Sequence, residues 1–150
     1  MRKEQKLNNK GFSLVELIIV IAIMAVLVAV LAPQFLKYVE RARNSTDVSN
    51  ATEIVTALQV AAADPTFMDE ANHNLEDTTI EVTDSAVTGI KDGFFKDALE
   101  NANITPSTCK SKSAWKKYSI IVKAVGGGLT FDYADDAFKS AMTKGSVSSN

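Results

Sequence analysis

A glycine, an aromatic residue and a carboxylate lie close together near the N-terminus of this chain of 150 residues, at Gly11, Phe12 and Glu16. Gly11 has no side chain, so the backbone there can enter a protease cleft with little steric hindrance. Glu16 is the only charged residue between Phe12 and Leu36, and a carboxylate at the middle of a membrane-spanning helix costs about 2.5–3.5 kcal/mol. A sequence that bears this cost usually uses the charge, and Gly11 taken alone could equally be a flexible joint before the helix.

An apolar segment of membrane-spanning length must position Glu16. Residues 17–36 contain no charge and no glycine, and as a helix they would extend about 30 Å, the thickness of a bilayer core. Arg2, Lys3, Lys6 and Lys10 precede the segment against a single acid, Glu4. This flank predicts a cytoplasmic N-terminus and an external C-terminal region.

Three interpretations of the segment compete. A secretory signal peptide has an apolar core of about 7–15 residues followed by a small-residue cleavage site, whereas this run is longer and its small residue, Gly11, precedes it. A plain membrane anchor explains the length and the flanking charges, but it gives no reason for Glu16 or for Gly11-Phe12. A precursor that is cut before the apolar segment explains all of these features.

The stretch Gly11-Phe12-Ser13-Leu14-Val15-Glu16 resembles the processing motif of type IV pilins and their relatives. The resemblance implies a leader of residues 1–11, a cut between Gly11 and Phe12 by a membrane prepilin peptidase, and N-methylation of the new terminal residue, Phe12. It also implies that Phe12 and Glu16 act in assembly, because the carboxylate of an incoming subunit neutralises the terminal amine of a neighbour.

Pro33 lies where major pilins place a helix-loosening proline. Because proline removes a backbone N–H and clashes with the preceding turn, a kink or a locally opened turn is expected near residues 29–33. The hydrophobic helix for the membrane or the filament core is therefore expected over residues 12–36, with the kink near its end.

The pilin resemblance also implies partners and a location. It implies a homopolymer of pilin copies, held in the bacterial cytoplasmic membrane before assembly and assembled by a membrane platform protein and an ATPase into a cell-surface pilus. Such a pilus serves adhesion, aggregation or surface motility. A minor pilin or a pseudopilin of a type II secretion or competence system shares the same N-terminal chemistry and stays open as an alternative. A membrane-anchored binding module, which would keep its leader, is the alternative from another class of protein.

The helical pattern continues after Pro33 as an amphipathic segment, residues 37–63. Asp64-Pro65 should end the helix, because a residue that precedes proline disfavours helical geometry. The charged residues, including Asp47, are expected mostly away from the apolar face. Apolar residues recur there at spacings of three and four, at Val48, Ala51, Val55, Leu58 and Ala62.

Residues 64–150 are expected to form a globular head. Tyr118, Ile120 and Val122 alternate with other residues at the start of a strong β signal over residues 117–133, and Gly126-Gly127-Gly128 supplies a tight turn. A short alternating run at residues 79–82 and a short helix over residues 94–102 are also expected. The resemblance implies an α+β fold, a long N-terminal helix packed on a small antiparallel sheet.

Several functions find no support in the sequence. Residues 37–150 carry 12 basic and 16 acidic side chains, and nucleic-acid binding needs a clustered basic face. No catalytic grouping, cofactor motif or metal-ligand spacing is present. The only histidine, His73, is expected to be a solvated loop residue, and the only cysteine, Cys109, is expected to be a partly buried small side chain that cannot form an intrachain disulfide.

Overall fold

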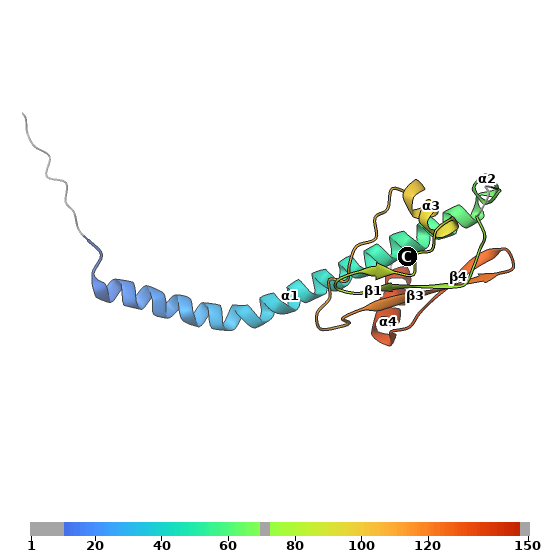
Figure 1. Ribbon diagram of the computed structural model, residues 1–150. Coiled ribbons are helices and arrows are strands. Elements are labelled where there is room, and N and C mark those ends of the chain that lie inside the picture. The colour runs from blue at the N-terminus through green and yellow to red at the C-terminus, as the bar shows by residue number, and fades with distance from the viewer. Residues whose placement is uncertain (1–10, 70–72, 148–150) are drawn as a thin grey trace, which may run out of the picture. The chain divides into compact units, whose positions relative to one another are not determined.

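The computed structural model describes residues 11–69 and 73–147 (Figure 1). The chain divides into two units, Met1–Tyr38 and Val39–Asn150, each described here by itself. The first ten residues of the predicted leader lie outside the described residues. The long helix α1 (Leu14–Ala63) continues from the first unit into the second.

The unit that ends at Tyr38 presents an apolar helical surface to solvent. Every large apolar side chain of residues 12–36 is exposed, Phe12 by 89% and Ile18 by 51%. α1 contains an 18-residue window of mean hydropathy 3.2 with none of it buried. By length and composition, this helix can cross a membrane.

The second half of α1 buries one face in the head. Ala51 and Leu58 are fully buried, as the apolar spacing predicted, and Val48, Val55 and Ala62 are partly buried. The buried face is wider than predicted and also includes Asp47, Ile54, Ala57 and Ala61. The expectation that Asp47 lies away from this face is wrong, because the side chain finds hydrogen-bond donors in the interior.

The end of α1 at Ala63 confirms the prediction from Asp64-Pro65. Asp64 has extended backbone geometry, and its side chain accepts a hydrogen bond from the N–H of Thr66 at 2.9 Å. The same pair therefore starts the short helix α2 (Pro65–Met68), with Asp64 as N-cap and proline at the first position.

Four antiparallel strands form the sheet, in the spatial order β2-β1-β3-β4. They are β1 (Thr78–Val82), β2 (Val87–Thr88), β3 (Tyr118–Val125) and β4 (Gly128–Tyr133). Gly126 and Gly127, with φ of 61° and 81°, form the two-residue turn between β3 and β4, a conformation that favours glycine. The sequence-predicted hairpin and the α+β class are confirmed.

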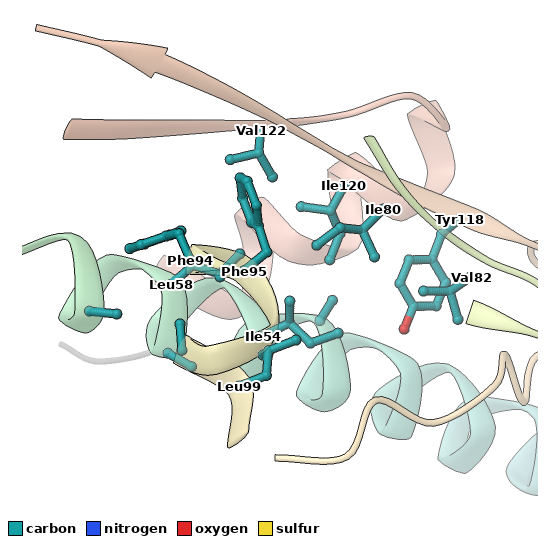
Figure 2. Close-up of a cluster of buried hydrophobic side chains, with 14 of the residues drawn as sticks. Ile54, Leu58, Ile80, Val82, Phe94, Phe95, Leu99, Tyr118, Ile120 and Val122 are labelled. Carbon is teal, nitrogen blue, oxygen red and sulfur yellow. The ribbon is translucent and has the colours of Figure 1, made fainter. Parts of the chain in front are cut away.

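The core lies between one face of the sheet and the second half of α1 (Figure 2). Ile80 pairs with Ile120 across β1 and β3, and both are fully buried. Helix α3 (Phe94–Asn101) adds Phe94 and Phe95. Helix α4 (Asp136–Val147) adds Phe138, whose ring stacks on Tyr118 at 4.1 Å between centroids. These apolar contacts fix the head on α1.

The expectation of a solvated His73 is wrong. The residue is 5% exposed and stacks on Phe67 at 4.2 Å between ring centroids. Its Nδ1 lies 2.6 Å from the Phe67 carbonyl oxygen, and its Nε2 lies 2.9 Å from Asp97 Oδ2. Both ring nitrogens therefore have polar partners inside the head. His73 therefore joins α2 to α3 inside the head.

Candidate functional site

The predicted processing site lies just before α1. Gly11, Phe12 and Ser13 are exposed and have no regular secondary structure, and the helix begins at Leu14 rather than at the predicted Phe12. A methyl group added at Gly11 would have no heavy atom within 4 Å apart from its chain neighbours. The packing of the described chain therefore does not require glycine at this position, and the peptide bond is open to an external reagent.

Glu16 caps the start of α1. Its Oε2 accepts a hydrogen bond from the backbone N–H of Ser13 at 2.8 Å, and the Ser13 carbonyl oxygen accepts from Leu17 N–H at 3.2 Å. A glutamate three residues after an N-cap serine is one half of a capping box. The spacing Ser13-x-x-Glu16 is a signal in the sequence from which this cap can be predicted.

The cap places the Glu16 carboxylate where a negative charge is stabilised. The first turn of a helix has unpaired N–H groups and a positive partial charge. A charge-assisted hydrogen bond to one of those N–H groups is about twice as strong as a neutral one. An uncut chain therefore already offsets part of the cost of holding Glu16 beside apolar residues.

Pro33 lies inside α1, which remains helical through it. The predicted kink stays a prediction. Within the described residues, no group of three or more His, Cys, Asp and Glu side chains is arranged to hold a metal ion.

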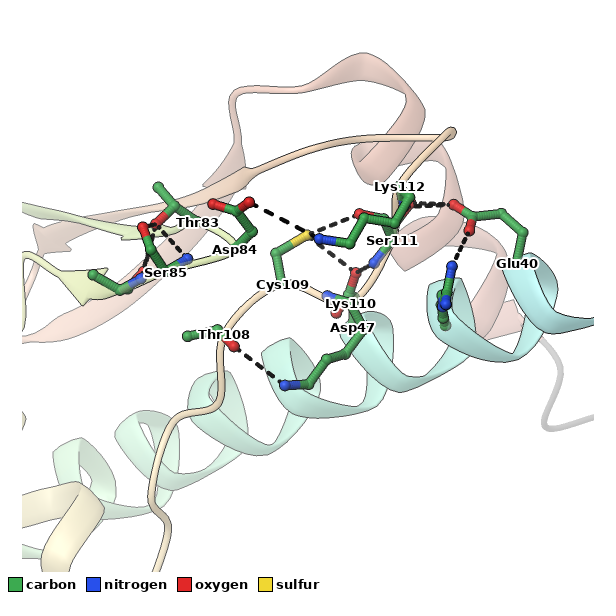
Figure 3. A network of polar contacts seen from close by, with 12 residues as sticks. Glu40, Asp47, Thr83, Asp84, Ser85, Thr108, Cys109, Lys110, Ser111 and Lys112 are labelled. Atoms are coloured by element: carbon green, nitrogen blue, oxygen red, sulfur yellow. Dashed lines mark hydrogen bonds and ion pairs between the residues drawn. The ribbon is translucent and has the colours of Figure 1, made fainter.

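A second polar site lies in the head, where residues 103–117 pass along α1 without helix or strand. This segment, here called the strap, is fastened to α1 by two carboxylates (Figure 3). Asp47 is fully buried and accepts from Lys110 N–H at 2.7 Å, Ser111 N–H at 2.8 Å and Trp115 Nε1–H at 2.9 Å. The Cys109 thiol donates to the same carboxylate at 3.3 Å.

Glu40 holds the strap two helical turns earlier. One oxygen, Oε1, accepts from the Ser111 hydroxyl at 2.9 Å and from Lys112 and Ser113 N–H at 2.7 Å each. Hydrogen bonds from the Ser113 N–H first, then from the Lys112 N–H and the Ser111 hydroxyl, lower the pKa of the Glu40 carboxyl from 4.5 to about 2, against the opposing effect of desolvation. The strap therefore binds the ionised form of Glu40.

Cys109 is an interior side chain. It is 3% exposed, so the prediction of a partly buried side chain understated its burial. Desolvation and then the neighbouring Asp47 raise the pKa of its thiol from 9.0 to about 12. Because the thiolate is the reactive form, this cysteine is chemically inert in the folded head.

Sequence reasoning missed both strap carboxylates for a physical reason. Asp47 and Glu40 accept from groups that lie 62 to 73 residues further along the chain. Most of these donors are backbone N–H groups, which every residue type except proline provides. No local pattern could have identified them.

Comparison with known proteins bears on the site at the start of α1. Residues 6–32 match the family described as the prokaryotic N-terminal methylation motif. Over 103 residues, the chain is 31% identical to prepilin peptidase-dependent protein A of Clostridium perfringens, and the match covers 65% of this chain and 69% of that protein. The chain belongs to the type IV pilin family.

Other relatives of this pilin match over a shorter length. Type IV major fimbrial protein FimA of Dichelobacter nodosus is 38% identical over 62 residues, which cover 41% of the chain and 39% of FimA. Type IV major pilin protein PilA of Myxococcus xanthus is 41% identical over 50 residues, which cover 33% of the chain and 23% of PilA. The pilin thus spans well under half the length of these two relatives. No solved structure matches it.

Replacing Asp47 should destabilise the pilin head strongly. In Asp47→Ala, three N–H donors and a thiol lose their acceptor, so the free energy of unfolding should fall by about 3 kcal/mol or more. Urea unfolding of the full chain in detergent, followed by the fluorescence of Trp115, the only tryptophan, measures this loss. Glu53→Ala removes an exposed carboxylate from the same helix and should change stability by less than about 0.5 kcal/mol. Equal losses in the two variants would contradict the assigned role of Asp47.

The strap should make stability depend on pH through Glu40. Its pKa is lower in the folded state, so the carboxylate contributes stability above pH 4.5, and this contribution is lost as the pH falls toward 2. Glu40→Gln should therefore be less stable than the unaltered pilin above pH 4.5, and the difference should shrink in acid. Urea titrations at a series of pH values test this, and a constant difference across the series would show that the charge of Glu40 is irrelevant.

Proposed function

We propose that this pilin is the filament-forming subunit, the major pilin, of a type IV pilus. The proposal rests on the exposed apolar surface of residues 12–36, which has a single carboxylate, Glu16, at its start. Such a surface requires lipid or other apolar helices around it. Lipid covers it in the bacterial cytoplasmic membrane before assembly, and copies of the same helix cover it afterwards.

Processing is the first step of the proposed function. A prepilin peptidase removes the leader, residues 1–11, by cutting between Gly11 and Phe12, and Phe12 becomes the N-methylated first residue. The exposure of both residues and the absence of any packing need for a side-chain-free Gly11 support this step. Cleavage creates a cationic amine about one helical turn from Glu16.

Assembly then uses the new charge. An amine and a carboxylate attract strongly where the dielectric constant is low, and a buried charge without a partner is costly. The Glu16 carboxylate of an incoming subunit neutralises the terminal amine of a neighbour already in the filament. Since both groups sit at the start of an apolar helix, only a specific stagger between neighbouring helices brings them together.

Further copies add by the same contact. A head-to-tail contact that does not close on itself gives an open helical filament. A membrane platform protein and an assembly ATPase extract each subunit from the membrane, and a kink at Pro33 lets the helix adapt to its neighbours. The filament serves adhesion, aggregation or surface motility as a structural polymer, without catalysis.

Analysis of the mature N-terminus tests the processing step. Mass spectrometry of cell-associated protein should find a first peptide that begins at Phe12 and carries one additional methyl group. In Gly11→Val the branched side chain should hinder entry into the protease cleft, so precursor accumulates. Gly128→Ala, a change in the hairpin of the head at a glycine whose added methyl group would make only an ordinary contact, serves as the control and should be processed normally. Mature protein that retains residues 1–11 would overturn the proposal.

Loss of Glu16 should separate cleavage from assembly. Glu16→Ala should be cut normally, whereas its yield of sheared surface filaments in electron micrographs should fall at least about tenfold, the effect of losing about 1.4 kcal/mol per contact. Asp92→Ala is the control, because it removes an exposed carboxylate of the head that lies far along the chain from the apolar segment. Abundant normal filaments from Glu16→Ala would count against the charge pairing. Scarcity of the unaltered pilin in sheared fibres would favour a minor pilin or pseudopilin.

A further inference from the structure

A groove with an apolar floor is lined by the second half of α1, by α2 and by α3 with the residues that follow it. Its volume is about 440 Å³. Ala57, Ala61, Phe67 and Ala98 provide buried apolar walls. Val60 also lines the groove, with 66% of its surface exposed. The apolar lining of the groove is thus partly exposed, at Val60.

Charge limits what can occupy this groove. Two exposed carboxylates, Glu53 and Asp64, line it together with the apolar residues, and no basic side chain does. An occupant should therefore bring apolar side chains accompanied by positive charge, because opposite charges at the edge of a contact steer and orient it.

The exposed apolar residues of the pilin itself limit which segment could occupy the groove. Among the described residues, every exposed large apolar side chain lies within residues 12–38 except Val60 and Val125. Residues 17–36 carry no charge. Within the described part of this stretch, both properties occur together at its C-terminal end: Phe35 and Tyr38 are 66% and 64% exposed, and Lys37 and Arg41 lie beside them in the sequence.

We propose that the groove between α1 and α3 holds residues 35–38 of a second copy of this pilin. This inference rests on the proposed function, since the second copy is a neighbour in the filament. Phe35 and Tyr38 of one copy cover Val60 and the alanine floor of the other. Lys37 and Arg41 lie toward Glu53 and Asp64. Aromatic side chains that fill a pocket are the usual energetic centre of such contacts.

The proposed contact joins the end of the apolar segment of one copy to the head of another copy. Residues 35–38 follow the apolar segment directly, whereas the groove belongs to the head. A filament held by this contact would therefore join the helix of one subunit to the head of the next. The terminal amine and Glu16 would set the stagger between neighbouring subunits. The groove would increase the surface that the subunits bury against each other at this same stagger.

Disulfide trapping in assembled filaments tests the contact. Phe35→Cys and Val60→Cys are introduced together, and sheared filaments are oxidised mildly and separated under non-reducing conditions. Because each copy supplies one partner to each of two neighbours, the double variant should give a ladder of covalent multimers, whereas each single variant should give monomers. Cys109 should add no background, since it is buried. Its thiol also stays protonated.

A second pair tests the competing occupant. Val125 is the other exposed apolar side chain of the head, and Lys123 lies two residues before it. A ladder from Val60→Cys with Val125→Cys, and none from Val60→Cys with Phe35→Cys, would overturn the proposal in favour of the hairpin. Filaments that yield no ladder from either pair would also overturn it, while leaving polymerisation intact. Absence of filaments from the unaltered pilin would instead refute the proposed function.

A neutral substitution provides an independent measurement. Val60→Gln should lower the yield of sheared filaments relative to Val125→Gln, because only the first places a polar amide in the groove. Processing at Phe12 and the urea midpoint of the head should be equal in both variants, which excludes misfolding as the cause. Equal filament yields from the two variants would contradict the contact.

Discussion

Water strongly disfavours the apolar side chains of residues 12–36, and their own unit leaves them exposed. These side chains need an apolar environment around them. The segment suits such an environment, because it has the length of a bilayer core and little polarity. A polar group is tolerated there only where its hydrogen bonds are met. Glu16 meets this condition at the first turn of α1, where it accepts a hydrogen bond from the N–H of Ser13. The cap therefore allows a carboxylate to lie at the start of the apolar surface.

The second half of α1 holds the head together, with an apolar face on one side and two carboxylates that bind the strap. Its apolar face packs against the sheet, and the carboxylates of Glu40 and Asp47 hold the strap. Two acids seven residues apart project from the same side of a helix about two turns apart. A segment with no secondary structure of its own is thereby held along its length by two acceptors rather than by apolar packing alone.

Local signals were sufficient to predict much of the fold. The end of α1 follows from Asp64-Pro65, and the β3–β4 hairpin follows from alternation around Gly126-Gly127, since both depend on the conformational limits of proline and glycine. Long-range contacts decided the rest. The burial of His73 and Asp47 depends on Asp97 and on the strap, and neither partner is near in sequence. The motif around Gly11 and Glu16 pointed to the family, and the spacing Ser13-x-x-Glu16 also allows the capping role of Glu16 to be predicted from the sequence.

Because the chain contains one cysteine and fastens its strap with carboxylates, a reductant has no bond to cleave in this head. Many small exported domains need an oxidising compartment, and the enzymes that introduce disulfides, before they are stable. The stability of this head does not depend on such a compartment. Its surface should keep its shape in strongly reducing surroundings where a cystine-closed loop would open.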